Sequence, residues 1–388
     1  MKLLILTQKI DINDDLLGFM HGWVAEFARH FESIIVVALS AGEYSLPENV
    51  KVFSLGKASL VCHSRPLRRS FSEASESGNL GSGSRVPPSP RLWRASKPGM
   101  TNGISKKLKY VFNFFRYIWR ERKNYDTVLV HMNKEYLVLG GLFWRFWGKK
   151  TALWYNHKKG NIISNLAGCL AGQIFYTSPF SFFAKWPKAQ IMPVGIDTNL
   201  FKPDLAVEKN PASILFLGRI SPVKKVEVLV EALGLLKKEG VNFNASIIGD
   251  APERDKQYGE EINQRIKKLN LSDQVKIKEK IPNWQAPAIF NQHEIFVNLT
   301  PSGSMDKTIF EAMACGCLVL AANKSLAEEV GSKLLFENSN PVDLADKIKN
   351  ALQLDATGRV NMLNKLREFV VKKHSLNFLA ERLKESLK

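Results

Sequence analysis

Two basic side chains follow directly on one of the apolar runs of this sequence. Arg219 comes at once after "ASILFLG", which reads as a strand that ends at Gly218, and Lys224 lies five residues further on, just before a helical stretch. In an open α/β domain, ligands bind at the carboxyl ends of the strands. A planar guanidinium, an ammonium group and the first amides of a helix together suit a diphosphate. Alternatively, Arg219 and Lys224 are solvated surface charges, which are common in so basic a protein.

A second stretch, "PSGSMDKTIFEAMACG" over 301–316, reads as a loop that leads into a helix. Gly303 and Ser304 permit close approach of a ligand to the backbone. The first amides of the helix have no partner within it and can donate to phosphate oxygens. These amides belong to Lys307, Thr308 and Ile309.

The two acids of this stretch each have two interpretations. Glu311, one turn inside the helix, can accept the paired hydroxyls of a ribose, or it can complement the positive end of the helix dipole. Asp306 can face the same ligand, or it can be the N-cap residue of the helix. Residue types and spacing leave both alternatives open.

These residues need elements to hold them, and the sequence predicts two series of alternating strands and helices. The first series occupies the first half of the chain, and the alternation restarts after residue 210. Continuous apolar strands of this kind are typical of parallel sheets that are buried on both faces. We therefore predict an α/β protein with two doubly wound, Rossmann-like domains. The predicted ranges are 1–198, 199–365 and a C-terminal helix over 366–388 that packs back on the first domain.

One segment departs from this alternation. Residues 59–103 are rich in Ser, Pro, Gly and Arg and show no apolar period. Such a segment cannot bury enough apolar surface to offset the entropy of ordering it, so we predict a disordered basic insertion in the first domain. It is either an inert loop or a tether to nucleic acid or a membrane.

Composition limits the classes of function. The chain has 388 residues, a net charge of +18 and four cysteines. The charge implies an anionic partner, which can be nucleic acid, an acidic membrane surface or a phosphorylated ligand. The cysteine spacing fits neither a zinc site nor a disulfide framework, and no apolar run reaches the length of a membrane span. We expect a cytoplasmic protein, soluble or peripheral to a membrane, with no metal and no cofactor.

The motifs together resemble those of glycosyltransferase family 4 and its relatives with the GT-B fold. The stretch "GRISPVKK" (218–225) is similar to the family's element with an Arg and a Lys, and "PSGSMDKTIFEAMACG" to its "EAMACG" element. "IMPVGIDTNLFKP" (191–203) resembles the junction between the family's two domains, and "IIGDAPE" (247–253) resembles a turn of the second. The resemblance implies a GT-B fold, in which the two domains face each other across a cleft.

The resemblance also implies a site for a nucleotide diphosphate sugar. Arg219 and Lys224 would bind the diphosphate, Glu311 would bind the ribose hydroxyls, and the backbone near Ile281 would lie against the base. The remaining donor-binding residues that it implies are Gly218, Gly303, Ser304, Asp306, Lys307, Thr308 and Ile309. The family's acid eight residues before Glu311 would fall on Gly303, with Asp306 as the nearest acid. Because that acid contacts the transferred sugar, the resemblance does not identify the sugar.

The first half of the chain matches the family more loosely. Gly18, in "DINDDLLGFMHG", is similar to the family's Gly-rich loop, which would contact the donor phosphate. His157 follows a predicted strand, and by resemblance it would bind the transferred sugar; a His satisfied at a strand end is the alternative. His131 ends another predicted strand and is a further candidate for the cleft, with Glu135 as an acid on the acceptor side.

The implied reaction is retaining transfer of a hexosyl group from a nucleotide diphosphate sugar to a glycan or lipid-linked acceptor, as in envelope polysaccharide or glycolipid synthesis. Arg219, Lys224 and a helix N-terminus would stabilise the leaving diphosphate, so no metal is expected. A nucleotide-sugar-binding protein with impaired transfer and a nucleotide-sugar epimerase are the alternatives. Nucleic-acid binding is disfavoured, because no motif with stacking aromatics accompanies the charge.

The acceptor is expected to bind the first domain, where one segment has the composition of a membrane-binding helix. Residues 105–123, "SKKLKYVFNFFRYIWRERK", place apolar residues at helical spacing with Lys and Arg between them. The segment is either a helix that packs on the sheet or one that docks to anionic lipid at the inner face of the membrane.

Overall fold

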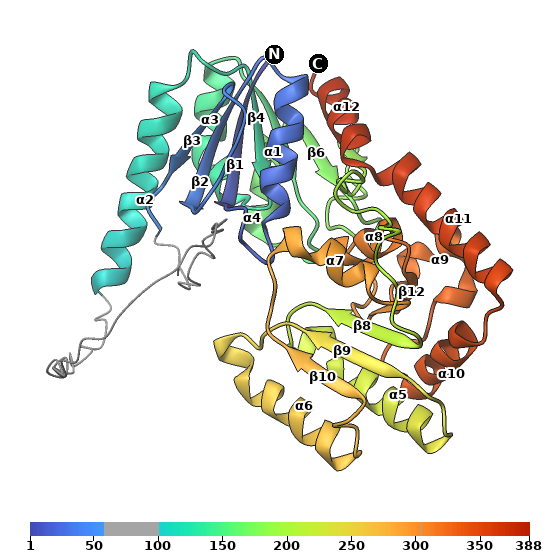
Figure 1. Ribbon diagram of the computed structural model, residues 1–388. Helices are drawn as coiled ribbons and strands as arrows, with labels where there is room; N and C mark the ends of the chain where they lie inside the picture. Colours follow the sequence, from blue (N-terminus) through green and yellow to red (C-terminus); the bar gives the residue numbers. More distant parts are fainter. Residues whose placement is uncertain (58–100, 304) are drawn as a thin grey trace, which may run out of the picture.

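The computed structural model describes residues 1–57, 101–303 and 305–388 (Figure 1). Most of the predicted insertion, 59–103, lies outside the described residues. Its last three residues belong to a helix, α2, so the predicted boundary is three residues too late. Among the described residues, no helix combines the length and the apolarity that crossing a bilayer requires.

The first sheet has seven strands in the order β3-β2-β1-β4-β5-β6-β7, and every neighbouring pair is parallel. Its strands are β1 Lys2–Ile10, β2 Ser33–Ala41, β3 Val50–Ser54, β4 Thr127–His131, β5 Lys150–Trp154, β6 Gln173–Tyr176 and β7 Ala189–Ile191. The helices of this half are α1 Phe19–His30, α2 Thr101–Arg120, α3 Glu135–Phe146, α4 Ile162–Leu170 and, from the end of the chain, α12 Leu376–Ser386.

Both faces of the first sheet are covered, which explains its continuous apolar strands. Leu3 and Ile5 of β1 pack in the core that α1 and α12 cover, whereas Leu4 and Leu6 pack in the core beneath α2, α3 and α4. Alternate residues of a strand point to opposite faces, so the central residues of such a strand are apolar on both faces.

The second sheet has five parallel strands in the order β10-β9-β8-β11-β12. These strands are β8 Ser213–Leu217, β9 Asn244–Ile248, β10 Val275–Lys278, β11 Ile295–Asn298 and β12 Leu318–Ala321. Its helices are α5 Val226–Lys238, α6 Lys256–Lys268, α7 Ala286–Asn291, α8 Lys307–Ala314, α9 Ala327–Val330, α10 Pro341–Leu352 and α11 Ala356–His374. The strand order reverses between β8 and β11, and such a point is where open sheets bind ligands.

The chain crosses between the two halves twice, at neighbouring positions. The amide of Ile196 donates to the carbonyl of His374 at 2.8 Å, and the amide of Leu376 donates to the carbonyl of Ile196 at 2.7 Å. Leu366 and Val370 of α11 still pack in the core of the second sheet. The chain therefore returns to the first sheet at the start of α12.

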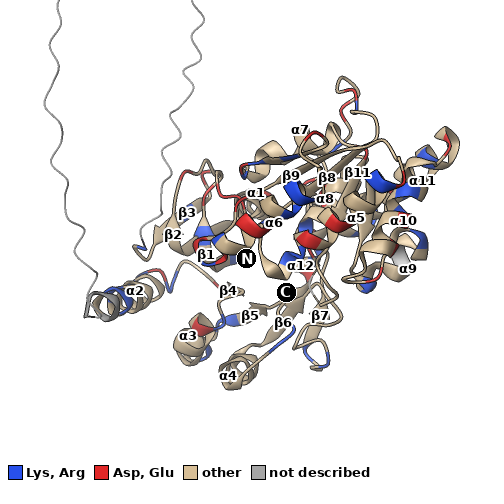
Figure 2. Ribbon diagram, turned by 90° about the horizontal axis from the view of Figure 1, so that it is seen from below, with Lys and Arg blue, Asp and Glu red and all other residues tan. Residues whose placement is uncertain are grey.

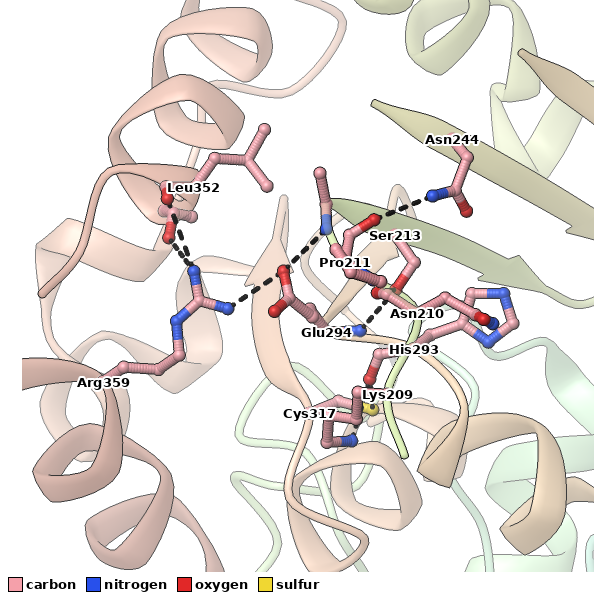
Figure 3. Close-up of polar contacts among 12 residues, drawn as sticks. Lys209, Asn210, Pro211, Ser213, Asn244, His293, Glu294, Cys317, Leu352 and Arg359 are labelled. Atoms are coloured by element: carbon pink, nitrogen blue, oxygen red, sulfur yellow. Dashed lines mark hydrogen bonds and ion pairs between the residues drawn. The ribbon is translucent and has the colours of Figure 1, made fainter. Parts of the chain in front are cut away.

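A polar network at the amino-terminal edge of the second sheet joins α11 to the strands (Figure 3). Arg359 of α11 forms an ion pair with Glu294 at 3.1 Å, and Glu294 accepts from the amide of Ala212 at 3.1 Å. Cys317 donates its thiol hydrogen to the carbonyl of Phe290 at 3.0 Å. Since these residues precede β8, β11 and β12, the network fixes the edge opposite to the carboxyl ends of the strands.

Candidate functional site

One pocket lies at the carboxyl ends of β8 and β9, next to the start of α8, and the loop after β1 reaches over it. Seven of the predicted donor-site residues line it: Gly218, Arg219, Lys224, Ile281, Asp306, Thr308 and Glu311. Asp15 and Leu16, from the loop between β1 and α1, line the same pocket from the first half of the chain. The two sheets therefore contribute to one site.

The floor of the pocket is backbone. The amide of Gly218 donates to the carbonyl of Ile248 at 3.0 Å, so the chain leaves β8 beside the end of β9. Gly249 has φ +147°, and a Cβ at this position would lie 1.9 Å from the carbonyl oxygen of Gly218. No other residue type fits between these two turns.

We expect Gly249→Ala to reduce the free energy of unfolding by about 3–4 kcal/mol, because backbone strain adds to overpacking against a backbone atom. Gly240→Ala is the matched control: Gly240 also has a positive φ, +72°, but nothing lies within 4 Å of its Cβ position. This control should lose only about 1 kcal/mol. Denaturant unfolding measures both changes, and equal losses in the two variants would contradict the close approach.

Arg219 supplies an unpaired positive charge to the pocket. Its guanidinium is exposed, and within the described part of the chain it forms neither an ion pair nor a hydrogen bond. A guanidinium with free donors can bind phosphate oxygens in a bidentate manner. Arg219 therefore agrees with its predicted place at the diphosphate.

Lys224, in contrast, already has an anionic partner. Its Nζ lies 2.5 Å from Oδ2 of Asp306 and 2.9 Å from the hydroxyl of Thr300. Lys224 ends the 3-10 turn that follows β8, whereas Thr300 and Asp306 follow β11. Because β8 and β11 are neighbours at the point where the strand order reverses, their loops face each other. A diphosphate at Lys224 would have to share this cation with a carboxylate.

Asp306 is also the N-cap residue of α8. Its carboxylate accepts from the amide and hydroxyl of Thr308, at 3.3 and 2.9 Å, and from the side chain of Asn298 at 3.2 Å. Burial alone would raise the pKa of Asp306, but the charge of Lys224 and these donors hold it below its ordinary value. The N-cap interpretation is confirmed, and the carboxylate stays ionised.

Two of the three amides that were predicted to be free at the start of α8, those of Thr308 and Ile309, have partners in the structure. The amide of Thr308 donates to the Asp306 side chain, and that of Ile309 donates to the Asp306 carbonyl at 3.2 Å. The carboxylate of the N-cap residue thus accepts from one of these amides and its backbone carbonyl from the other. Ile309 itself is buried in the core of the second sheet.

Glu311 is a buried acid at the wall of the pocket. Its side chain is 3% exposed, and Oε1 accepts from the amide of Asn283 at 3.1 Å. Oε2 has no hydrogen bond to any residue that the structure describes. Burial raises the pKa of Glu311, although Asn283 and the charge of Lys307 oppose this change. A buried carboxylate with one unused oxygen suits a ligand that donates hydroxyl hydrogens.

The side chain of Lys307 points away from the pocket and joins the two halves of the molecule. Its Nζ donates to the carbonyls of Val194 and Gly195, at 2.6 and 3.2 Å, in the segment between the two sheets. It also lies 4.4 Å from the ring centre of Phe19 and 4.3 Å from that of Trp23, both in α1. Burial lowers the pKa of Lys307. The side chain of Lys307 is therefore a contact between the two halves, and the donor contact of its backbone amide stays a prediction.

The loop between β1 and α1 is held in place by its own acids and by a contact across the cleft. Lys9 pairs with Asp11 at 2.9 Å and with Asp14 at 2.7 Å. The indole of Trp284 donates to the side chain of Asn13 at 3.2 Å. Leu16 and its neighbour Asp15 thus come to lie over the pocket of the second sheet.

Gly18 has a packing role at this loop. Its amide donates to the carbonyl of Asp14 at 3.2 Å, so the predicted phosphate contact would compete with this bond. A Cβ on Gly18 would lie 2.5 Å from that carbonyl and 3.2 Å from Cβ of Asn283, across the cleft. The two halves can approach this closely only because residue 18 is glycine.

The three site candidates in the first half of the chain, His157, Glu135 and His131, have different environments in the structure. His157 lies in the exposed loop after β5, with its ring centre 5.2 Å from that of Tyr155. Partial burial and the charge of Lys134 lower the pKa of His157, while Glu135, the exposed first residue of α3, raises it. These groups lie near one another at the carboxyl end of the sheet, outside the lining of the pocket.

His131 is buried, and the prediction that it faces the cleft is wrong. Its ring centre lies 5.8 Å from that of Trp23, 6.1 Å from Phe19 and 6.4 Å from Trp154. Burial, together with the charge of Lys307, lowers the pKa of His131 to about 3. A neutral ring packed among aromatic side chains belongs to the core of the first half.

Gly303 contacts the first half of the molecule. Its φ is +128°, and a Cβ would lie 3.1 Å from Cδ of Lys158, in the loop after β5. The position at which the family pattern has an acid therefore lies beside a lysine from the other side of the cleft. Its neighbour Ser304 lies outside the described residues.

The pocket contains more acids than the sequence suggested. Three basic and four acidic side chains line it: Arg219, Lys224 and Lys280, and Asp15, Asp250, Asp306 and Glu311. Sequence reasoning missed nine lining residues, and the polar ones among them are Asp15, Asp250, Lys280 and Asn283. The position of Asp250, two residues after β9, was a usable signal, whereas Asn283 follows no strand directly. The pocket is thus not a purely cationic cradle, despite the net charge of the chain.

Comparisons with known proteins agree with this architecture. Residues 197–370 match the family model for glycosyl transferases group 1. The putative colanic acid biosynthesis glycosyltransferase WcaL of Escherichia coli (strain K12) is 24% identical over 201 residues, which cover 49% of this chain and 48% of that protein. A D-inositol 3-phosphate glycosyltransferase of Segniliparus rotundus is 24% identical over 173 residues, which cover 42% and 35%. The chain spans about half the length, or less, of these curated relatives.

Solved structures match along the whole chain. Anabaena Alr3699/HepE in complex with UDP has a TM-score of 0.71 at 17% identity, and the match covers 100% of this chain and 99% of that one. The same protein has been solved with UDP-glucose. Sucrose-phosphate synthase from Thermosynechococcus elongatus has a TM-score of 0.72 at 16% identity, covering 99% and 98%. At these identities the similarity shows the fold, and it confirms the predicted GT-B arrangement.

Proposed function

Because residues 197–370 match the family model for glycosyl transferases group 1, we propose that this chain is a retaining, metal-independent glycosyltransferase. It would move a hexosyl group from a nucleotide diphosphate sugar to a glycan or lipid-linked acceptor. The observation that carries this proposal is the pocket itself. It brings the unpaired cation Arg219 and the buried acid Glu311 together at the point where the order of the second sheet reverses.

The residues suggest how the donor would lie. Arg219 and Lys224 would bind the diphosphate and stabilise its charge as it leaves. Glu311 would accept the ribose hydroxyls, and the backbone near Ile281 would lie against the base. His157, from the other side of the cleft, would reach the transferred sugar. No group of three metal-binding side chains occurs among the described residues, and independence of metals stays a prediction.

The relatives support a proposal for the biological setting. WcaL carries the description of a colanic acid biosynthesis enzyme, which supports polysaccharide or glycolipid assembly as the process. Alr3699/HepE has been solved with UDP and with UDP-glucose, which makes a UDP-sugar the first donor to test. We propose that the chain works in the cytoplasm, at the inner face of a membrane if its acceptor is lipid-linked.

A thermal-shift screen of nucleotide sugars with the purified chain tests the donor site. A ligand at 100 times its Kd stabilises the folded state by about 2.7 kcal/mol, and we expect UDP and at least one UDP-sugar to raise the Tm. Release of UDP from that sugar, measured with and without added acceptors, then tests transfer. A screen in which neither UDP nor any other nucleotide raises the Tm would overturn the proposal.

A nucleotide-sugar-binding protein with impaired transfer is the second candidate. Gly303 favours it, because the residue expected to contact the sugar is absent and Lys158 lies against that position. The two candidates differ in turnover. A binder gives the thermal shift but no release of UDP from the sugar, whereas a transferase gives both.

A further inference from the structure

The outer surface of the helices that cover one face of the first sheet is rich in exposed apolar side chains. In Figure 2, α2, α3 and α4 form one outer layer of the molecule. The exposed fractions are 67% for Phe112 and 55% for Trp119 in α2, 67% for Leu142 and 87% for Phe146 in α3, and 85% for Ile162 in α4. With Leu108 of α2, these six residues define what we call the α2–α4 face.

The α2–α4 face also contains an apolar groove. Aromatic side chains of α2 and of the end of α3 line it and touch across it, with ring centres 5.6 Å apart for Phe115 and Phe143 and 5.5 Å apart for Trp119 and Trp147. The groove has a volume of about 680 Å³. Large apolar surfaces that stay exposed are typical of sites that bind a protein or a membrane.

Positive charge is concentrated in the segment that carries most of this apolar surface. Residues 101–150 contain eleven Lys or Arg and only three Asp or Glu, an excess of eight positive charges out of the +18 of the whole chain. Within the described residues, Lys106, Lys107, Lys109 and Arg116 of α2 form no ion pair. Basic side chains beside exposed Trp, Phe and Leu are the combination that binds the interface of an anionic bilayer.

The α2–α4 face adjoins the opening of the cleft. In a parallel sheet with helical crossovers, each helix begins near the carboxyl end of the preceding strand. Ile162 opens α4, directly after the loop that carries His157 and Lys158. A molecule anchored in a bilayer beneath this face would therefore have its head group near the acceptor side of the cleft.

We propose that the α2–α4 face docks on an anionic lipid bilayer, with its aromatic and aliphatic side chains among the acyl chains and its Lys and Arg at the head groups. This inference deepens the proposed function and rests on it only for the lipid-linked acceptor. The face could instead be covered by a second copy of this chain or by residues 58–100. Its positive charge favours an anionic bilayer over both of these. A second copy would bring the same basic surface, and 58–100 has seven Lys or Arg against two Asp or Glu. Like charges disfavour both contacts.

Co-sedimentation of the full chain with vesicles tests the proposal. Vesicles of phosphatidylcholine mixed with phosphatidylglycerol should bind it, and vesicles of phosphatidylcholine alone should bind at least about tenfold less. The double variants Phe112→Asp/Phe146→Asp and Lys106→Glu/Lys109→Glu should each lose at least about tenfold in binding to the mixed vesicles.

Two variants elsewhere on the surface are the matched controls. Leu205→Asp changes an exposed apolar residue, and Lys267→Glu/Lys268→Glu reverses two exposed charges on α6; both should bind vesicles like the unchanged chain. The Tm increase produced by UDP should be the same in all variants, so that a failed donor site and a failed docking face are distinguished.

Several results would overturn the inference. The first is equal binding to both kinds of vesicle, or binding to neither kind. The second is a loss of binding in the control variants as large as that in the variants of the α2–α4 face. The third is a dimer in solution that Phe112→Asp/Phe146→Asp converts to monomers, which would assign the face to a second copy.

Discussion

We expect Glu311→Gln to weaken the binding of UDP by about 100-fold. One oxygen of this buried carboxylate accepts from Asn283, and the other has no partner among the described residues, so ribose hydroxyls complete its hydrogen bonding. A hydrogen bond to a charged group contributes about 1.5–3 kcal/mol, and about 2.8 kcal/mol corresponds to 100-fold in Kd. Isothermal titration calorimetry with UDP measures the change.

A change of ligand shows whether the ribose is the group that Glu311 binds. The unchanged chain should prefer UDP over 2′-deoxy-UDP, and Glu311→Gln should lose most of this preference. Glu260→Gln, on the exposed side of α6, is the matched control and should behave like the unchanged chain. If Glu311→Gln keeps the full preference for UDP, the carboxylate does not bind the ribose.

The binding of UDP should also depend on pH through Glu311. Burial raises the pKa of this carboxyl above its ordinary value of 4.5, opposed by Asn283 and Lys307. The ionised form is the better acceptor, so affinity should fall as the pH is lowered through the raised pKa, beginning at a higher pH than for an exposed Glu. Since the phosphates of UDP titrate equally in both experiments, the difference between the profiles of the unchanged chain and Glu311→Gln isolates this carboxyl.

Lys224→Ala should weaken the binding of UDP by more than the loss of one cation explains. The substitution leaves the ionised carboxylate of Asp306, 15% exposed and formerly 2.5 Å from Nζ, at the diphosphate end of the pocket. Truncating one partner of a buried charge pair costs about 2–5 kcal/mol, and we expect about 3 kcal/mol, or more than 100-fold in Kd. Calorimetry with UDP again measures it.

The double variant Lys224→Ala/Asp306→Asn separates the two causes. Asparagine keeps an N-cap for α8 but removes the negative charge, so the double variant should regain about tenfold in affinity over Lys224→Ala, a non-additive result. Lys280→Ala is the control, because Lys280 lines the same pocket but is half exposed, with its Nζ 3.9 Å from Asp250. Its loss should stay below about 1 kcal/mol. Equal affinities for the single and double variants would show that Asp306 does not act on the ligand.

The sequence by itself determined the local features of the site. The apolar run before Gly218 makes a buried strand wherever the chain folds, and a charged residue just after such a strand must lie at its carboxyl end, as Arg219 does. The short acid before "KTIFEAMA" made Asp306 a candidate for the N-cap, and the helical period placed Glu311 one turn inside α8. These features depend on neighbours within a few residues, so residue type and spacing indicate where each side chain lies along its element.

The tertiary structure alone decided the partners of the charged side chains. Lys224 and Asp306 are 82 residues apart in sequence, and Lys307 and Val194 are 113 apart. These contacts depend on the order of the strands and on how one half of the molecule packs against the other. Local sequence patterns carry no information about either. For the same reason, His131 at the end of one strand is enclosed by aromatic rings, whereas His157, just after another strand, lies in an exposed loop. Whether a side chain meets a ligand, a counter-charge or the core depends on which distant surface packs against it.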